Sequence, residues 1–296
     1  MCIRDSSQLV WGPLSDRFGR RPILLVGTAL YVLASVGSAM VTSIGQLIVL
    51  RVLQGAAMGA GVMCARAVVR DLFAPTEGAR IMSKGLTGLG VIACLSAPVG
   101  GLLAEHFGWR VALLALAVFG ALTLTVVALR FDETLLKKNP RALEPMTLLR
   151  TWGQIARHPT FWAYTLLATT SYAGLFTFLA AGSFVFIGVL GLSKPAYGLA
   201  MLTMSLSYIT GTFICRRLLP RFGVRRTVAV AGVATLTAGT SMGVMALMGV
   251  QSVAAIMAPF YLFMLGHGVH QPCGQSGAVG PFPQAAGAAS ALIGFL

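Results

Sequence analysis

The stretch Gly12–Leu25, GPLSDRFGRRPILL, places three arginines and an aspartate between two apolar segments. A second stretch, Leu218–Arg226 (LLPRFGVRR), repeats the RFG triplet and the paired arginines. Aligning Gly19 with Gly223 gives an offset of 204 residues. The same offset aligns Leu14 with Leu218, Arg17 with Arg221, Phe18 with Phe222 and Arg21 with Arg225. This internal repeat indicates a chain built from two similar halves.

The composition around these two turns is that of a membrane protein. The chain of 296 residues is 56% hydrophobic and only 10% charged, whereas soluble domains carry roughly 25% charge. A membrane-spanning helix needs about 20 apolar residues, and five runs without Lys, Arg, Asp or Glu reach that length. They are Pro22–Leu50, Gly85–Ala104, Val111–Leu129, His158–Ser193 and Thr227–Leu296. Backbone groups facing lipid must be paired within a helix or barrel, and alternating ten-residue strands are absent from the sequence.

We therefore expect eight complete helical spans, with a helix stump before them and another span beginning near Ala286. The expected spans are Ile23–Val41, Ile44–Val69, Ile81–Leu103, Val111–Leu129, Phe161–Ile187, Ala196–Leu219, Thr227–Met248 and Ser252–Gly277. Arg130–His158 is the one long polar segment between spans, and it divides the chain into two parts.

The charged residues predict the orientation of these spans. Most of the 22 Lys and Arg fall in four loops, at 13–21, 70–84, 130–158 and 216–226, whereas the opposite loops hold only Arg110 and Lys194. Short cytoplasmic loops are rich in Lys and Arg, so the linker and both RFG turns are expected in the cytoplasm. This pattern also explains the net charge of +14 without a nucleic-acid partner.

The offset of 204 residues between the two copies of the repeat predicts the domain organisation. At about 34 residues per span and loop it corresponds to six spans, and parallel six-span halves joined by a linker are typical of secondary transporters. We assign 1–6 to a non-native leader, 7–129 to an N-terminal bundle, 130–158 to a cytoplasmic linker and 159–296 to a C-terminal bundle. Both ends of the sequence fall inside apolar segments, which predicts a truncated chain.

Three motifs resemble those of the major facilitator superfamily. Gly12–Arg21 resembles its motif A, Leu47–Gly59 (LxxxRxxQGxxxG) its motif B, and Ala97–Gly101 its motif C. Three further stretches resemble the Bcr/CflA group of drug-resistance proton antiporters. They are Arg70–Phe73, Gly108–Arg110 and Ala286–Leu292. The resemblance implies an all-α polytopic membrane protein with two pseudo-symmetric six-helix bundles. The chain would cover about spans 2–11 of the 12, without spans 1 and 12.

Motif A predicts a gate at the cytoplasmic side. The residues assigned to it are Gly12, Asp16, Arg17, Gly19, Arg20, Arg21 and Asp71. Glycines allow close helix approach, and arginines should keep Asp16 charged; we expect Asp16 to pair with Arg20 near Asp71. The family resemblance adds a contact with the N-terminal end of span 11, which would favour the outward-open state. The alternative is a turn that only sets topology, and Pro220, at the Asp16 position of the second copy, predicts that role there.

Motifs B and C predict proton coupling and a hinge. By resemblance, Arg51 with Gln54 and Gly55 couples protons, commonly with an acid in span 1. The alternative is an arginine that extends to the outer surface. Pro98, Gly100 and Gly101 would kink span 5, a feature that the family associates with export; ordinary membrane glycine content is the alternative.

Polar and aromatic residues of the second half are candidates for a substrate or proton cavity. They are Thr170, Tyr172, Phe176, Tyr208, His267 and His270. The two histidines are three residues apart and share a helix face. No third ligand accompanies them, so no metal is expected, and ordinary packing is the alternative to a proton relay. All eight Asp and Glu lie in loops or at span ends, so the coupling acid was in span 1 or the histidines replace it.

These features predict proton-coupled efflux of drugs or small amphipathic compounds across the bacterial inner membrane by alternating access. The alternatives are a metabolite exporter (amino acid, sugar or polyamine), a transport-incompetent fragment, and an intramembrane enzyme using the two histidines. We expect membrane lipid, protons and a lipophilic substrate as partners, a monomer, and no enzyme activity or cofactor. The GxxxxGK[ST] loop of ATP-binding proteins does not occur in the sequence.

Overall fold

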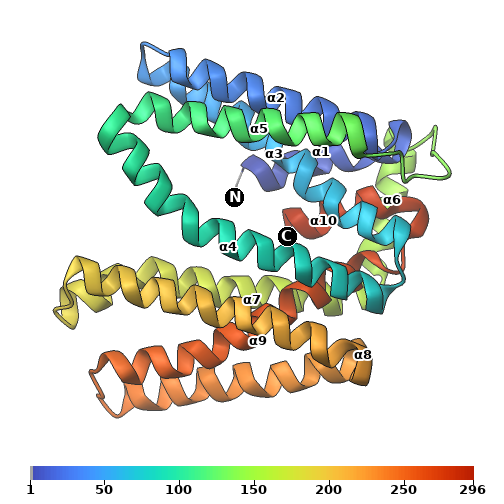
Figure 1. Cartoon of the computed structure of the whole chain (residues 1–296). Coiled ribbons are helices and arrows are strands. Elements are labelled where there is room, and N and C mark those ends of the chain that lie inside the picture. Colours follow the sequence, from blue (N-terminus) through green and yellow to red (C-terminus); the bar gives the residue numbers. More distant parts are fainter. Residues whose placement is uncertain (1–2) are drawn as a thin grey trace. The chain divides into compact units, whose positions relative to one another are not determined.

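A computed structural model describes residues 3–296, apart from the side chains of Ala93, Ala97, Pro98, Gly101, Glu105, Lys194 and Pro195. Within that range every regular element is a helix (Figure 1). The all-α prediction is confirmed, and the helices extend the predicted spans at one or both ends. Their bounds are α1 Ile3–Phe18, α2 Arg20–Met40, α3 Ile44–Leu72, α4 Pro75–Phe107, α5 Trp109–Arg130, α6 Pro145–Arg157, α7 Pro159–Ser183, η1 Phe184–Val189, α8 Lys194–Leu247, α9 Val253–Val279, η2 Pro283–Ala285 and α10 Ala286–Phe295.

Two compact units make up the chain. The first comprises Met1–Ala74, Ser96–Trp162 and Gly277–Leu296, and the second comprises Pro75–Leu95 and Ala163–Ser276. The first unit thus contains α1, α2, α3, α5, α6 and α10, and the second contains most of α4, α7, α8 and α9. The predicted division by chain order, with its boundary at 130–158, is a different grouping and stays a prediction.

Six helices among the described residues are long and apolar enough to cross a membrane. One of them, Ala196–Leu247 within α8, is 52 residues long, with apolar sequence on both sides of the basic segment Arg216–Arg226. At 1.5 Å per residue this is more than twice the length that one crossing needs. It divides at Gly223, where φ is 67° and ψ is 176°. We therefore count α8 as two spans, as the sequence predicts.

The duplicated RFG turns share a backbone feature. Gly19 has φ of 112° and separates α1 from α2, and Gly223 at the equivalent position also has positive φ. Side chains with a Cβ rarely adopt this region, so glycine is the residue that lets a helix break there. The repeat seen in the sequence is thus a repeat of structure at these two turns.

The linker contains a helix that the sequence interpretation missed. Pro145 occupies the first turn of α6, where its missing N–H is not needed. Ile155 of this helix is fully buried within the first unit. The segment was interpreted as a polar connection because its basic residues dominate the composition, whereas its apolar residues are few and spaced for one helix face.

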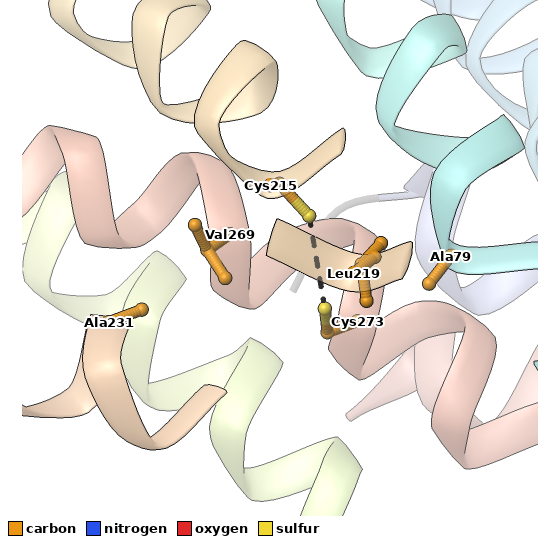
Figure 2. Close-up of a cluster of buried hydrophobic side chains, with 6 residues drawn as sticks. All are labelled: Ala79, Cys215, Leu219, Ala231, Val269 and Cys273. Atoms are coloured by element: carbon orange, nitrogen blue, oxygen red, sulfur yellow. Dashed lines mark hydrogen bonds between the residues drawn. The ribbon is translucent and has the colours of Figure 1, made fainter. Parts of the chain in front are cut away.

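A small apolar core joins three helices of the second unit (Figure 2). Its members are Ala79 of α4, Cys215, Leu219 and Ala231 of α8, and Val269 and Cys273 of α9. The sulfur atoms of Cys215 and Cys273 lie 3.9 Å apart. Sequence spacing gave no reason to associate these two cysteines, because helix packing alone brings them together.

Candidate functional site

A buried ionic network occupies the turn at Gly12–Arg21. The side chains of Asp16 and Arg20 are 4% and 0% exposed, and Arg20 Nη1 lies 2.7 Å from Asp16 Oδ1. Arg20 Nε donates to Asp71 Oδ2 at 2.9 Å, and Nη1 also donates to Ser15 Oγ at 2.6 Å. One arginine thus joins the end of α1 to the end of α3, because its planar group presents several donors in fixed directions.

Asp16 also binds the N-terminal end of α10. Its Oδ1 accepts from the Gly287 N–H at 3.0 Å and its Oδ2 accepts from the Ala288 N–H at 2.9 Å. The first N–H groups of a helix have no partner within the helix and carry partial positive charge. The carboxylate therefore acts as the cap of α10, although it lies 271 residues away in the chain.

Two glycines allow α1 and α10 to approach this closely. A Cβ on Gly12 would lie 2.5 Å from the Gly287 carbonyl oxygen, and a Cβ on Gly287 would lie 2.5 Å from the Gly12 carbonyl oxygen. The same added atom on Gly287 would lie 2.7 Å from Asp16 Oδ1. Because these neighbours include backbone, a side chain at either position must separate the helices.

Burial dominates the titration of the acid in this network. It raises the pKa of Asp16 above its ordinary value, against the charge of Arg20 and the hydrogen bonds from Arg20, Ala288 and Gly287. Removing water from a carboxylate disfavours its charged form. A buried ion pair of this kind defines a geometry, and removing one partner leaves a charge without compensation.

The remaining arginines of the turn do not join this network. Arg17 is exposed, and its guanidinium lies 5.3 Å from the centre of the Phe18 ring. Arg21 donates from Nη2 to the Ala128 carbonyl at 2.9 Å, near the C-terminal end of α5. Both were predicted as gating residues. The structure places Arg17 at the surface and Arg21 against α5, where a cation is favourable at the negative end of a helix.

The start of the linker binds the same turn. Glu133 accepts from the Arg20 N–H at 2.8 Å and from the Arg21 N–H at 3.3 Å, which caps α2. Thr134 Oγ1 donates to Asp71 Oδ2 at 3.3 Å, and the Asn139 N–H donates to the Asp16 carbonyl at 2.9 Å. Sequence reasoning missed these contacts, because a polar linker gives no indication of where it lies.

Backbone donors also affect the titration of Glu133. Its partial burial alone would raise the pKa, but hydrogen bonds from the N–H groups of Leu135, Arg20 and Arg21 outweigh that influence. The pKa of Glu133 is therefore lowered. Hydrogen bonds to the charged form have this sign, so Glu133 is a carboxylate when it caps α2.

Two arginines of α3 bind the same C-terminal segment as Asp16. Arg66 Nη1 donates to the Ser290 carbonyl of α10 and to Gln8 Oε1 of α1, each at 3.1 Å. Arg70 Nε donates to the Gly280 carbonyl at 2.6 Å. The two arginines are four residues apart and share a face of α3, a spacing that the sequence displays and that was not interpreted.

The motif B residues form a polar chain between α3 and α2. Arg51 Nη1 donates to Gln54 Oε1 at 2.7 Å, and Gln54 Nε2 donates to Ser35 Oγ at 2.6 Å. Gln54 is buried while Arg51 is exposed in the described structure. An added Cβ on Gly55 would meet nothing within 4 Å, so Gly55 marks no close approach among the described residues.

Of the predicted hinge in α4, only Gly100 has a described environment. A Cβ added to Gly100 would have no neighbour within 4 Å among the described atoms. The surroundings of Pro98 and Gly101 lie outside the described part of the structure. The hinge at these three residues stays a prediction.

Part of the predicted cavity set gathers around His267 in the second unit. His267 Nδ1 lies 2.7 Å from Ser171 Oγ, and the ring centres of Tyr172 and Tyr208 lie 5.3 and 5.5 Å from that of His267. His270 is also buried, and its Nε2 has no hydrogen-bond partner among the described residues. Both imidazoles are thus enclosed, and one is held by a serine.

The other two members of that set lie outside this group. Thr170 is exposed and donates its hydroxyl to the Leu166 carbonyl of its own helix at 2.6 Å. Phe176 is 62% exposed and stacks on Tyr172, with ring centres 6.0 Å apart.

Gln271 and Gln275 lie on the His267 face of α9, at intervals of four, and Gln271 Nε2 donates to the Ala168 carbonyl at 3.0 Å. That periodicity was the signal which could have identified them.

No three His, Cys, Asp or Glu side chains of the described residues form a group suited to a metal ion. The candidate site residues form two groups, a buried carboxylate with arginines at the turn around Gly19, and enclosed imidazoles in the second unit.

Comparisons with known proteins agree with this architecture. A family model described as Major Facilitator Superfamily matches residues 6–296. The chain is 32% identical over 290 residues to "Multidrug resistance protein D" of Escherichia coli strain K12, covering 98% of this chain and 72% of that protein. It is 29% identical over 289 residues to the "Bicyclomycin resistance protein homolog" of Haemophilus influenzae, covering 97% of this chain and 72% of that protein.

Solved structures show the same fold. The human organic anion transporter MFSD10 superposes with a TM-score of 0.75 at 20% identity, over 99% of this chain and 72% of that chain. A double Trp mutant of XylE superposes with a TM-score of 0.79 at 17% identity, over 99% of this chain and 73% of that chain.

Proposed function

Because the chain belongs to the Major Facilitator Superfamily, and within it to the Bcr/CflA-type drug-resistance transporters, we propose that it exports drugs or small amphipathic compounds in exchange for protons. The names of its relatives support drug efflux, and its helices are those of a multi-pass membrane protein. We place it in the bacterial inner membrane, with the linker and the motif A turn in the cytoplasm, from the Lys and Arg bias of its loops.

The observation that carries the proposal is the binding of Asp16 to the start of α10. By chain order α1 belongs to the first six-span half and α10 to the second, so this contact joins the two halves. It requires the cytoplasmic ends of α1 and α10 to be together, and it is lost when they separate. We propose that it holds the cytoplasmic side closed, so that the transporter opens outward.

Alternating access then follows from breaking and remaking this contact. Two states of a transporter exchange populations when a ligand binds one of them more tightly. Substrate entering from the cytoplasm requires the separated state, in which Gly287 and Ala288 lose the carboxylate. Closure restores it, and proton entry from outside resets the cycle.

His267 is our candidate for the proton-handling group in this chain. Among the described residues, no Asp or Glu lies in the middle of a predicted span, while His267 is enclosed by Ser171, Tyr172 and Tyr208 with His270 one turn away. Histidine is the side chain whose charge changes between about pH 5 and pH 8. Arg51, bonded to Gln54, is the second candidate for coupling.

Transport by the protein in everted membrane vesicles tests the proposed function. A lipophilic cationic dye should accumulate when respiration energises the vesicles, and a protonophore should abolish the accumulation. Radiolabelled amino acids and polyamines, added in place of the dye, should not accumulate. Metabolite accumulation without dye transport would assign the protein to the metabolite exporters, and dye transport that survives the protonophore would exclude proton coupling.

The role of His267 is tested by His267→Asn. Asparagine can still bond to Ser171 but cannot take up a proton, so proton-coupled dye transport should fall about tenfold and lose its dependence on pH. Initial rates in everted vesicles buffered over a range of pH provide the measurement. Ser171→Ala, which removes the hydrogen bond and keeps the imidazole, should retain a pH dependence. An unchanged pH profile in His267→Asn would exclude His267 from coupling.

A further inference from the structure

The internal repeat relates two helix contacts to each other. The contact of α1 with α10 corresponds to the contact of α8 with α4. At the offset of 204 residues, Gly12 of α1 corresponds to Arg216 of α8. On the partner helices, Gly287 and Ala291 of α10 correspond to Ser83 and Thr87 of α4. A Cβ added to Gly12 would meet the Gly287 carbonyl oxygen and Ala291 Cβ. Arg216 meets the two residues at the equivalent positions.

The contact of α8 with α4 is made by hydrogen bonds instead of close glycines. Arg216 Nη1 donates to Thr87 Oγ1 at 2.6 Å and lies 3.3 Å from the Ser83 carbonyl oxygen. Ser83 Oγ donates to the Thr212 carbonyl at 2.7 Å, and the hydroxyls of Thr87 and Thr212 lie 2.6 Å apart. All of these contacts lie within the second unit.

We propose that Arg216, Ser83, Thr87 and Thr212 form a second clasp that holds α4 to α8 when the cytoplasmic side is closed. We call these four residues the α4–α8 clasp. The proposal rests on the proposed function, since it assigns them the task in the second repeat that Asp16, Gly12 and Gly287 have in the first. In the order of the chain α4 belongs to the first half and α8 to the second, so this contact also joins the halves.

The α4–α8 clasp gives the second copy of the RFG turn a charged contact, although that copy lacks the aspartate of the first. Pro220 stands where the first copy has Asp16, and it offers neither a charge nor an acceptor side chain. The sequence therefore predicted a turn that only sets topology, with Arg216 counted among its loop charges. The structure places Arg216 inside α8, partly buried, with its guanidinium 4.1 Å from the centre of the Phe213 ring. The second copy thus has a cation one turn before the position of Asp16, at the position of Gly12.

Electrostatics distinguish the two contacts. Asp16 accepts hydrogen bonds from N–H groups, whereas Arg216 donates to a hydroxyl and approaches a carbonyl oxygen. A hydrogen bond with one charged partner is stronger than a neutral one. In each of the two contacts one partner is charged, so separating the helices costs free energy in both repeats.

The apolar core of Figure 2 supplies a reporter for separation of α4 from α8. Ala79 lies on α4 one turn before Ser83, is fully buried, and packs in the cluster that contains Leu219 and Cys215 of α8 (Figure 2). A cysteine at position 79 is shielded from water-soluble reagents while the two helices are in contact. Ala79→Cys, in a background whose native cysteines are replaced by alanine, therefore reports the open state by its alkylation rate.

The test compares adjacent arginines of α8 in that background. Arg216→Gln should increase the alkylation rate of Cys at position 79 about tenfold, since a hydrogen bond to a charged group is lost. Arg217→Gln removes the same charge one residue later, at an exposed position, and should leave the rate within about twofold. Thr87→Val, which keeps the shape without the hydroxyl, should increase the rate about threefold. Combined with Arg216→Gln it should add little, because both remove one interaction.

Two outcomes of the alkylation assay would contradict the α4–α8 clasp. Equal rates in Arg216→Gln and Arg217→Gln would overturn the clasp, as would full additivity of Thr87→Val with Arg216→Gln. Arg216→Lys, which keeps the charge with fewer donors, guards against misfolding and should give an intermediate rate. The assay requires no substrate, so a failed dye-transport experiment and a failed clasp are separate outcomes. Asp16→Asn measured beside them, with Ser290→Cys as its reporter, tests the first contact independently.

Discussion

Asp16→Asn is expected to abolish drug resistance while the protein remains in the membrane at near-normal abundance. The asparagine side chain keeps one acceptor, but its amide group would face the N–H of Ala288 or Arg20, both of which are donors. Hydrogen bonds to charged groups are worth about 1.5–3 kcal/mol each, so losing one or two shifts the equilibrium between the closed and open states by about tenfold to about ten-thousandfold. Breaking one side of a buried ion pair adds to that cost.

Dye efflux from intact cells and membrane abundance by immunoblot measure the effect of this change. Asp132→Asn is the matched control, because Asp132 is an exposed acid in the same linker region that caps α2. We expect wild-type efflux from the control. Normal drug resistance in Asp16→Asn would rule out the contact with α10 as the gate, whatever the state of the α4–α8 clasp.

Gly287→Ala is expected to reduce efflux at least tenfold through geometry alone. Its Cβ would stand 2.5 Å from the Gly12 carbonyl oxygen and from Ser15 Oγ, and 2.7 Å from Asp16 Oδ1. Backbone cannot rotate away from such a contact, so α10 must move from α1 and the carboxylate must lose its N–H donors. The substitution leaves every charged group in place, which separates the packing requirement from the ionic one.

The measurement is efflux together with alkylation of Ser290→Cys, whose side chain is fully buried in α10. The alkylation rate should rise as efflux falls. Gly243→Ala in α8 serves as the control, because a Cβ there meets nothing within 4 Å among the described residues and alanine favours the helix. If Gly287→Ala transports at the wild-type rate with the cysteine still protected, the close approach of α1 and α10 is dispensable.

Local rules allowed the sequence to predict the spans and the ion pair of Asp16 with Arg20. Charge-free runs of sufficient length marked the spans, and a lone aspartate among arginines marked Asp16 as an ion-pair partner. Gly19 and Gly223 were visible as a repeat, and positive φ at both explains why glycine stands there. These inferences need only the identity of a residue and its near neighbours in the chain.

Contacts between segments that are distant in the chain could not be predicted from these local rules. Glu133 and Arg216 looked like ordinary charges of a linker and a loop, because nothing in their neighbourhood reveals that one meets the start of α2 and the other meets α4. Arg17 belongs to the same motif, but its side chain is exposed and lies over Phe18, so its role in gating stays a prediction. Helix packing decides such cases, and a pattern of residue types does not encode it.

The capping of α2 by Glu133 determines where the polypeptide tolerates added sequence. Glu133, Thr134 and Asn139 bond this connection to α2, Asp71 and Asp16, and hydrogen bonds fold 139–144 into a turn before α6 begins at Pro145. Between these two anchored parts Leu136, Lys137 and Lys138 are exposed. A protease site or fluorescent domain inserted among these three residues should therefore leave the bonds of both parts intact. The same insertion next to Glu133 should instead separate the carboxylate from the N–H groups of α2.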